Sequence, residues 1–339
     1  AEAANLPRVY DSVEAMVADP DIDVVHIASP NHVHADQARL VLDAGKHVVC
    51  EKPLALTSEE TADLLARADA SGLINAVCFN IRFYPNCHQA RSLVAAGEVG
   101  TPRLISGSYM QDWLLLETDW NWRLESEKAG ALRAVADIGS HWLDLARFIA
   151  GANVTQVMAD LHTFVKVRKH PAGPVETFAV TDDDEELIEE AMESDDGAGI
   201  LLRFDNGARG VVTISQVSAG RKNSVSIEVD GSESALSWCS ENPDDLWIGH
   251  RGRPNEILPR DPSLASPEAA RIIGYPGGHV EGYPDTFRAL FGEVYADVLA
   301  GGPAATPTYP TFADGHDALL VTEAVARSSQ EQRWIPVER

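Results

Sequence analysis

The sequence lacks any apolar run long enough to cross a membrane. A spanning helix needs about 20 mainly apolar residues, whereas the longest apolar segments here, such as 23–28 and 197–204, have the length of strands. Positive charge is also scarce, since 27 Lys and Arg residues stand against 52 Asp and Glu residues, a formal net charge of −25. A negative field of this size repels phosphate groups. The composition therefore argues against a membrane protein and against nucleic acid as a partner.

Cysteine is rare as well. The four cysteines form no C-x-x-C pair and show no zinc-ligand spacing: Cys50, Cys78, Cys87 and Cys239. We therefore expect no metal site. Two of them stand in apolar, strand-like runs and are interpreted as small core residues. This usage fits a reducing cytoplasm, where we expect the protein to be.

One acidic segment carries part of the negative charge. Residues 182–196 hold ten Asp or Glu residues. A calcium-binding loop requires an Asp-x-Asp-x-Asn-Gly spacing, which this segment lacks. We interpret the whole segment as a solvated surface loop or helix face.

The first 80 residues alternate between strand-like and helix-like segments. Strands are predicted at 9–10, 23–28, 46–50 and 75–79, and helices at 11–18, 34–44 and 57–71. Strands that alternate with helices of 10 to 15 residues are typical of βαβ units and a parallel sheet.

From about residue 85 the pattern changes to longer segments that favour an antiparallel sheet. Strands are predicted at 103–109, 154–167, 199–204, 208–216, 224–230 and 233–237, and helices at 86–96, 139–149, 284–300 and 311–328. Asp205-Asn206-Gly207 is a hairpin-turn signal between two of these strands. We therefore predict an α/β domain with a parallel sheet, followed by an α+β domain with a broad sheet.

Two strands of the predicted parallel sheet end in unusual polar residues. Ser29-Pro30-Asn31-His32-Val33-His34 follows one strand, and Glu51-Lys52-Pro53 follows the next. Ligands of open parallel sheets bind at the carboxyl ends of the strands, so both segments are candidate binding residues. The alternative is that Pro30 and Asn31 are ordinary loop residues and that Lys52 is simply exposed to solvent.

A third feature is Asp137-Ile138-Gly139-Ser140-His141-Trp142-Leu143-Asp144. If a helix starts near Ile138, His141 and Asp144 lie one turn apart on one face, and Asp137 sits at the N-terminal end, where the helix dipole favours a carboxylate. The alternative is an N-capping Asp with a surface His. A metal site is a poorer interpretation, because one His and one Asp offer too few ligands.

Together these three features resemble the glucose–fructose oxidoreductase/inositol dehydrogenase (Gfo/Idh/MocA) family. Its members carry a P-N-x-x-H segment, an E-K-P segment and a D-x-G-x-H-x-x-D helix in this order. Further matches are Phe79-Asn80-Ile81-Arg82, Gly97–Pro102, Trp122-Arg123 and Leu202–Gly207. The resemblance implies a Rossmann-type dinucleotide-binding domain over residues 1–84. It also implies a substrate-binding and oligomerisation domain over residues 85–339, with a large, open, mostly antiparallel sheet.

The resemblance also assigns roles to residues. It makes Lys52, Asp137 and His141 catalytic, with His141 as the acid/base, Lys52 at the reacting hydroxyl and Asp137 orienting the substrate. A histidine with its ordinary pKa of about 6.5 suits proton transfer near neutral pH, and a lysine cation stabilises a forming alkoxide. The cofactor, NAD or NADP, is expected at these residues: Ser29, Pro30, Asn31, His34, Glu51, Lys52, Asn80, Arg82, Trp122 and Arg123.

The segment 111–123 is both aromatic and polar, a combination that binds sugars. It resembles the branch of the family that acts on sugars such as levoglucosan and on related pyranosides and cyclitols. The expected substrate-binding residues are Lys52, Trp120, Asp137, His141 and His279. The alternative for 111–123 is an ordinary packed loop.

One expected motif is absent. The family opens with a strand, a G-x-G-x-x-G loop and a helix, and no such loop occurs near the start of this sequence. We expect that about 50 further residues of the dinucleotide-binding domain precede residue 1 in a longer chain. The residue that selects NAD or NADP is expected in that preceding segment.

The sequence therefore predicts an NAD(P)-dependent oxidoreductase that moves a hydride to or from a hydroxyl-bearing carbon of a sugar or cyclitol. Two alternatives on the same fold are an NAD-dependent glycosidase and a non-catalytic, nucleotide-responsive regulator. A homo-oligomer, dimer or tetramer, is expected because the broad sheet has a face that must be covered.

Overall fold

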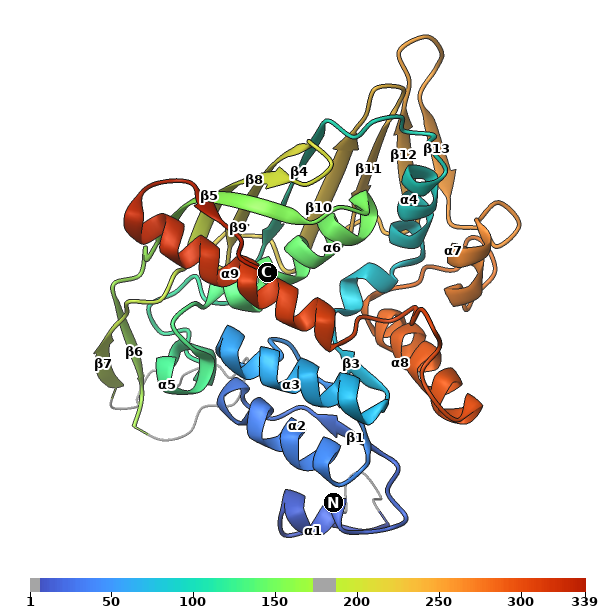
Figure 1. Ribbon diagram of the computed structural model, residues 1–339. Coiled ribbons are helices and arrows are strands. Elements are labelled where there is room, and N and C mark those ends of the chain that lie inside the picture. Colours follow the sequence, from blue (N-terminus) through green and yellow to red (C-terminus); the bar gives the residue numbers. More distant parts are fainter. Residues whose placement is uncertain (1–6, 173–186) are drawn as a thin grey trace. The chain divides into compact units, whose positions relative to one another are not determined.

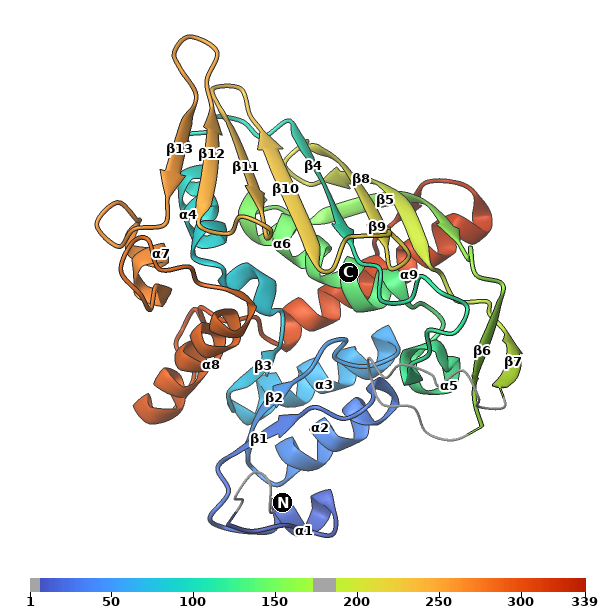
Figure 2. The same ribbon diagram turned by 180° about the vertical axis from the view of Figure 1, so that it is seen from behind.

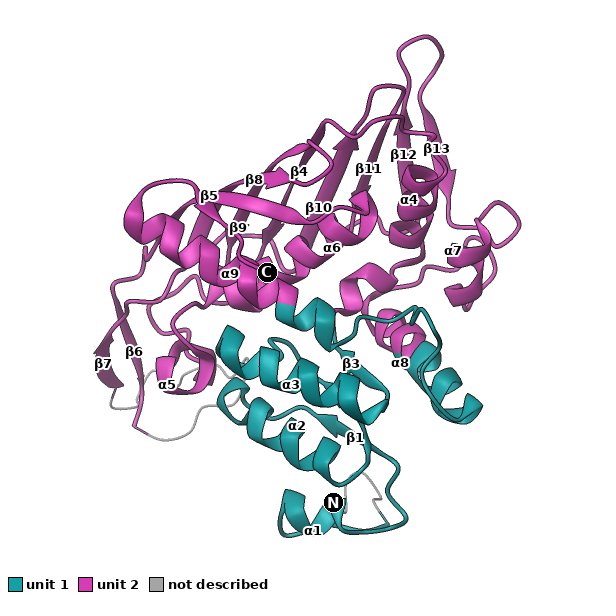
Figure 3. Cartoon of the chain, in the orientation of Figure 1, with its two compact units in different colours: residues 1–78, 291–316 teal, residues 79–290, 317–339 magenta. Residues whose placement is uncertain are grey.

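The computed structural model describes residues 7–172 and 187–339, which form two compact units (Figure 3). Unit 1 consists of the described residues up to Cys78 together with Phe291–His316, and unit 2 consists of Phe79–Leu290 and Asp317–Arg339. The borders of the later segments fall within α8 (Tyr283–Ala300) and α9 (Phe312–Glu331). The domain boundary at residues 84 and 85 stays a prediction, and the sequence did not indicate that a late segment joins the first unit.

Unit 1 is built on a parallel sheet in the order β1-β2-β3. Its strands are β1 (Val24–Ile27), β2 (His47–Cys50) and β3 (Asn75–Val77), and its first helices are α1 (Val13–Val17), α2 (His34–Asp43) and α3 (Ser58–Ser71). Local chemistry sets the ends of α3, because Thr57 and Glu60 form a capping box and Gly72 ends the helix in the left-handed conformation. The parallel sheet confirms the predicted fold class, whereas the predicted strand at 9–10 is wrong.

The late segment joins unit 1 through hydrogen bonds to β3. The backbone N–H of Val77 donates to the Pro310 carbonyl at 2.9 Å, and the N–H of Phe312 donates to Asn75 Oδ1 at 2.8 Å. Gly315 of α9 packs so closely that an added Cβ would lie 2.9 Å from Leu54 Cδ2. These contacts explain why residues distant in sequence form one unit.

Unit 2 contains a nine-stranded sheet in the order β13-β12-β11-β10-β4-β9-β8-β5-β14. Its strands are β4 (Leu104–Met110), β5 (Val154–His162), β8 (Gly197–Phe204), β9 (Arg209–Ser215), β10 (Ser224–Asp230), β11 (Ala235–Cys239), β12 (Asp245–Gly249), β13 (Glu256–Pro259) and β14 (Ile335–Pro336). All neighbouring pairs are antiparallel except β4 with β9. The prediction of a large, mostly antiparallel sheet is therefore confirmed.

Helices cover one face of this sheet (Figure 1), and the view from behind shows the strands in front of them (Figure 2). The covering helices are α4 (Pro85–Ala95), α6 (Ser140–Ala150) and the later part of α9. The core between them holds the fully buried Trp142, whose Nε1 donates to the Ser226 carbonyl at 2.8 Å. The shorter helices are α5 (Ser126–Ala129) and α7 (Pro267–Ile272).

The strand predicted over 154–167 is shorter in the structure. β5 ends at His162, and β6 (Val167–Pro171) pairs with β7 (Leu187–Ala191) in a separate two-stranded ribbon. None of the helices in residues 7–172 and 187–339 combines the length and apolar composition that a membrane span requires.

The prediction of a solvated acidic segment at 182–196 is wrong for its last two residues. Asp195 and Asp196 are buried, and Asp196 forms ion pairs with the buried Arg133 and Arg168. Buried carboxylates are tolerated only when paired, and both partner arginines are distant in sequence. Glu189 and other acidic residues of β7 are exposed, as predicted, while 182–186 lie outside the described residues.

A second buried ion pair fixes α6. The Arg82 guanidinium binds both carboxylate oxygens of Asp144, with a distance of 2.8 Å from Nε to Oδ2. The same guanidinium lies 4.8 Å from the centre of the Phe148 ring. This two-point contact ties the 3-10 helix Asn80–Phe83 (η3) to α6.

Replacing Gly107 tests the close packing of β4 against β10 and α6. A Cβ at this position would overlap the Ser226 carbonyl oxygen and lie 2.9 Å from Trp142 Nε1. We expect Gly107→Ala to lower the free energy of unfolding by about 1–3 kcal/mol. Urea unfolding followed by circular dichroism measures this. The matched control is Gly199→Ala in β8, where no atom lies within 4 Å of the new Cβ, and an equal loss there would contradict the explanation.

Removing Asp144 tests the buried ion pair. Asp144→Ala leaves the buried Arg82 charge without its carboxylate, so we expect a loss of about 3–5 kcal/mol in the free energy of unfolding. The control is Arg253→Ala, which breaks the exposed Arg253–Glu256 pair and is expected to cost no more than about 1 kcal/mol. Thermal and urea unfolding of both variants measure these losses. Similar losses of unfolding free energy in the two variants would contradict a stabilising role of the buried pair.

Candidate functional site

In unit 1, the candidate binding residues lie at one edge of the parallel sheet. Ile27 pairs with Cys50 at the carboxyl ends of β1 and β2, and the Glu51 N–H donates to the Ile27 carbonyl at 2.8 Å. The loops that follow these strands therefore meet there. Ser29 donates from its hydroxyl to Gln37 Oε1 at 2.7 Å. Pro30 then begins a short 3-10 helix, Asn31–Val33 (η2).

His34 connects the two loops. Its imidazole is fully buried, with Nε2 2.8 Å from the Ser29 carbonyl oxygen and Nδ1 2.8 Å from the Pro53 carbonyl oxygen. The ring thus ties the loop after β1 to the loop after β2. Burial and these two contacts give His34 a supporting role between the loops, and its predicted contact with a cofactor stays a prediction.

Lys52 stands directly after the end of β2 and is half-buried. The Lys52–Pro53 peptide bond is cis, and the Lys52 N–H donates to Glu51 Oε2 at 3.3 Å. Cys78 lies nearby, with its N–H 2.9 Å from the Cys50 carbonyl. Burial and the Glu51 carboxylate raise the pKa of the Cys78 thiol, so this sulfur stays protonated.

In unit 2, Asp137 and His141 occur on a continuous helical segment. A π-helical turn, Val135–Gly139 (η5), runs directly into α6. The helical segment therefore begins a few residues before the predicted start near Ile138, and Asp137 lies in its first turn, close to the predicted N-terminal end. The alternative that Asp137 is the N-cap residue is wrong, because Ala134 holds that position. The N–H groups of Arg133 and Val135 donate instead to the Asp195 carboxylate at 2.7 and 2.8 Å. The Asp195 carboxylate, which belongs to another segment of the chain, thus caps the start of this helical segment.

Gln216 and Arg123 are polar neighbours of the Asp137 carboxylate. Gln216 donates from Nε2 to Asp137 Oδ2 at 2.8 Å. Arg123 places its Nε 3.3 Å from Asp137 Oδ1, and its guanidinium lies 4.5 Å from the centre of the Trp122 ring. The structure thus brings Arg123 and Asp137 together, which the sequence placed in different parts of the site.

His141 lies one helical turn beyond Asp137 and is buried between aromatic rings. Its ring centre is 5.7 Å from that of Phe79, in an edge-on arrangement, and 6.4 Å from that of Tyr109. Burial raises the pKa of Tyr109 well above its usual range. The aromatic surroundings hold the imidazole in place, and Tyr109 stays neutral beside it.

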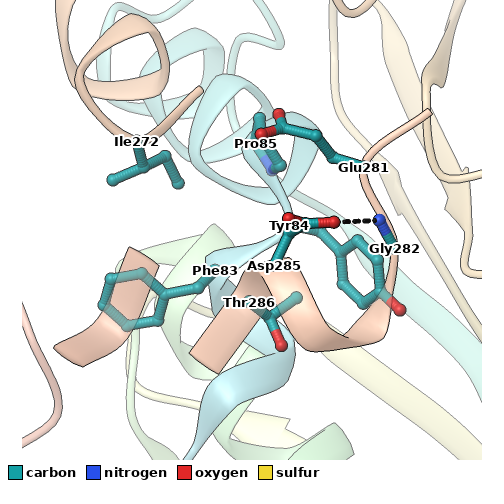
Figure 4. A pocket seen from close by; sticks show the side chains of 8 residues that line it. All are labelled: Phe83, Tyr84, Pro85, Ile272, Glu281, Gly282, Asp285 and Thr286. Carbon is teal, nitrogen blue, oxygen red and sulfur yellow. Dashed lines mark hydrogen bonds between the residues drawn. The ribbon is translucent and has the colours of Figure 1, made fainter. Parts of the chain in front are cut away.

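Asn80 is buried next to a small pocket of unit 2. Its Nδ2 donates to Thr286 Oγ1 at 2.8 Å, while the Thr286 hydroxyl donates to the Tyr283 carbonyl at 2.6 Å. This orientation leaves Asn80 Oδ1 buried, without a hydrogen-bond partner among the described residues. Thr286 also lines the pocket in Figure 4. The side chains there come from η3, α4, α7 and α8, and include Phe83, Tyr84, Ile272 and Asp285.

Three other predicted residues of unit 2 have different surroundings. Trp120 stacks on His170, with ring centres 3.7 Å apart. Arg82 forms a two-point ion pair with Asp144, and its predicted contact with a cofactor stays a prediction. His279 is exposed, and its carbonyl accepts a hydrogen bond from Arg260. No hydrogen bond in the described part of the chain links the His279 imidazole to Asp137 or His141.

Two residues at this site were missed by the sequence analysis. Gln216 and Arg133 are buried, and Gln216 Oε1 accepts from Arg133 Nη1 at 2.9 Å while its Nε2 contacts Asp137. Gln216 follows β9 and is far from Asp137 in sequence, so no local sequence pattern predicts the contact between Gln216 and Asp137. Arg133 stands only four residues before Asp137, but its role depends on Gln216 and Asp196.

Comparisons with known proteins identify the family. Residues 1–79 match the model of the oxidoreductase family with an NAD-binding Rossmann fold. Residues 87–237 match the GFO/IDH/MocA C-terminal domain. Levoglucosan dehydrogenase of Pseudarthrobacter phenanthrenivorans is 30% identical over 334 residues, which cover 95% of this chain and 82% of that protein.

Solved structures agree. Levoglucosan dehydrogenase in complex with NADH and levoglucosan is similar with a TM-score of 0.87 and 28% identity, covering 100% of this chain and 87% of that chain. An inositol dehydrogenase homolog from Azotobacter vinelandii, complexed with NADH and myo-inositol, has a TM-score of 0.80 and 26% identity, covering 96% and 80%. The family predicted from the ordered motifs is thus confirmed: the chain belongs to the GFO/IDH/MocA family of oxidoreductases, whose first domain is an NAD-binding Rossmann fold.

Proposed function

We propose that this protein transfers a hydride between a nicotinamide cofactor and a hydroxyl-bearing carbon of a sugar or cyclitol, with Lys52, Asp137 and His141 as its catalytic residues. The observation that carries the proposal is the pairing of Asp137 and His141 on consecutive helical turns, with Asp137 held by Gln216 and Arg123. The names of the similar proteins, which refer to levoglucosan and inositol, support this substrate class.

Each of the three residues has a distinct task in the proposed reaction. A ring nitrogen of His141 takes the proton from the substrate hydroxyl during oxidation and returns it during reduction. The Lys52 ammonium stabilises the oxygen as it becomes negative. Asp137 accepts a hydrogen bond from a neighbouring hydroxyl and so orients the ring.

The residues present fit a nicotinamide dinucleotide. The buried Asn80 Oδ1, which has no partner among the described residues, is an acceptor that suits the amide N–H donors of a nicotinamide. Ser29, Asn31 and Glu51, at the carboxyl ends of β1 and β2, offer further polar groups at the edge where such folds bind nucleotides. When bound, the nicotinamide accepts or returns the hydride. We propose the cytoplasm as the place of action, in keeping with the four free thiols.

Substitution of the catalytic residues tests the proposal. We expect Lys52→Ala and His141→Gln each to lower kcat/KM by about 10²–10⁴-fold, because each removes stabilisation of the transition state. The measurement is the change in nicotinamide absorbance with NAD+ and NADP+ against a panel of monosaccharides, anhydrosugars and inositols.

Two matched variants serve as controls for this experiment. Lys46→Ala removes a lysine from the opposite end of β2. His88→Gln removes another buried histidine that packs against phenylalanine rings. Both controls are expected to keep kcat/KM within a few-fold of the native value. The proposal is wrong if no compound of the panel is oxidised, or if the two test variants match their controls.

We also propose that the uncovered face of the large sheet joins a second copy of the chain. Three exposed apolar side chains form a row across adjacent strands, since Met158 of β5 pairs with Leu201 of β8, and Leu201 with Val211 of β9. A contiguous apolar row on a sheet face is typical of a protein–protein interface.

A charge in this row tests the assembly. We expect the native protein to run as a dimer or tetramer in multi-angle light scattering, and Leu201→Glu to shift it towards the monomer, because the new carboxylate is buried unpaired at the interface. The control is Leu264→Glu, at another exposed leucine outside the sheet. A native protein that is monodisperse as a monomer would refute the proposal.

A further inference from the structure

Asp137 lies at the end of a chain of buried polar contacts. Gln216 donates from Nε2 to Asp137 Oδ2 at 2.8 Å, and its Oε1 accepts from Arg133 Nη1 at 2.9 Å. Both Gln216 and Arg133 are buried, with 0% and 2% of their surfaces exposed. Both groups are therefore shielded from bulk solvent, and each hydrogen bond restricts the orientation of the next group.

The chemistry of the two end groups fixes which way the Gln216 amide faces. A guanidinium has only N–H donors, so the Gln216 atom that faces Arg133 must be the carbonyl oxygen. The Gln216 amino group then faces Asp137, where a carboxylate can accept. If the amide were reversed, its amino group would meet the donors of Arg133, and its oxygen would meet the oxygens of Asp137. Arg133 thus selects the single orientation in which Asp137 receives a hydrogen bond.

Arg133 is itself held by the acidic segment before β8. Its guanidinium pairs with Asp196 Oδ1, which also accepts from Arg168 Nη2 at 3.0 Å, and Asp196 Oδ2 accepts from the Val165 N–H at 2.8 Å. The backbone of Gln216 is fixed by the same segment, since its N–H donates to the Asp196 carbonyl at 2.9 Å. Arg133 and Gln216 therefore share one anchor.

Residue 195 anchors the backbone that carries Asp137. The Asp195 carboxylate accepts the N–H groups of Arg133 and Val135 at the start of η5, and the Asp137 N–H donates to the Arg133 carbonyl at 2.7 Å. Asp195 thus positions the main chain of Asp137, and the neighbouring Asp196 positions its side chain through Arg133 and Gln216. A carboxylate held at both levels is preorganised for a substrate hydroxyl.

We propose that Gln216 and Arg133 are positioning residues for Asp137: Arg133 orients the Gln216 amide, and the Gln216 amino group holds the Asp137 carboxylate as an acceptor for a substrate hydroxyl. The inference rests on the proposed function, which places Asp137 at the substrate. On this inference, the buried contacts of Arg133, Gln216 and Asp196 serve to orient the substrate as well as to stabilise the fold.

Gln216→Glu is the sharpest test, because it keeps the shape of the side chain and its contact with Arg133 but replaces the donor to Asp137 by an acceptor. We expect kcat/KM to fall by about 10- to 100-fold, mainly through a higher KM for the sugar or cyclitol, as misplacement of an orienting group does. Binding of NADH, followed by its fluorescence, should stay unchanged. The matched control is Gln156→Glu on β5, where a glutamine also accepts from an arginine, Arg203, at 2.6 Å.

A double-mutant cycle shows whether Gln216 acts through Asp137. In an Asp137→Asn background, Gln216→Glu should cost less than about 3-fold, since the group that it positions is already lost. Equal costs in both backgrounds, or a native KM in Gln216→Glu, would overturn the inference. If Asp137→Asn leaves the kinetics unchanged while the protein oxidises sugars, the proposed role of Asp137 fails, and the inference fails with it.

A readout without turnover keeps the inference testable if no substrate is found. The Asp137 carboxyl signal in 13C NMR is identified by its disappearance in Asp137→Asn. Arg123 on the other carboxylate oxygen, Tyr109 and His141 are the same in both proteins, so a difference reports on residue 216. We expect a higher pKa of Asp137 in Gln216→Glu than in the native protein, because a donor is replaced by a negative charge. An unchanged pKa would refute the contact on which the inference depends.

Discussion

Two buried arginines that share one buried carboxylate form the constraint on which the candidate site depends. Arg133 and Arg168 both pair with Asp196, and the adjacent Asp195 accepts the first N–H groups of the helical segment that carries Asp137 and His141. Burial raises the pKa of Asp195, an effect that these N–H donors oppose. Charges at this depth are stable only while every partner is in place. The cluster therefore fixes the start of the segment, the end of β9 and the ribbon strand β6 relative to one another within unit 2.

The same logic recurs on the other side of α6. Arg82 and Asp144 form a two-point ion pair that ties η3 to the helix, and Asn80 of η3 keeps a buried oxygen without a partner among the described residues. The helix with Asp137 and His141 is thus clamped by charge at its beginning and in its middle, while Trp142 joins it to the sheet below. A rigid helix of this kind suits a reaction whose rate depends on the placement of a hydroxyl within fractions of an ångström.

Much of the fold follows from local sequence signals. The capping box of Thr57 and Glu60, the left-handed Gly72 and the hairpin at Asp205-Asn206-Gly207 mark element ends that depend on their own residues alone. Periodicity likewise predicted α2, α3, β8 and β9 within a few residues. The elements that the sequence did not predict include β12, β13, β14 and α7. They are short or carry Gly and Pro, and a neighbouring strand or helix completes their hydrogen bonds and packing. Residues 9–10, where a strand was predicted, form no strand in the structure.

The sequence by itself determined the family, because three short motifs in a fixed order identify it even though each has an ordinary structural explanation. It also determined the residue types of the candidate site, whose roles stay proposals. Only the tertiary structure decided what surrounds them. Asp137 lies within a π-helical turn, His34 is a buried tie between two loops, and Arg82 is occupied by Asp144. It also decided that Asp195 and Asp196, which composition placed at the surface, are buried. The physical reason is that a charge is buried or exposed according to its partners, and here those partners lie up to 63 residues away along the chain.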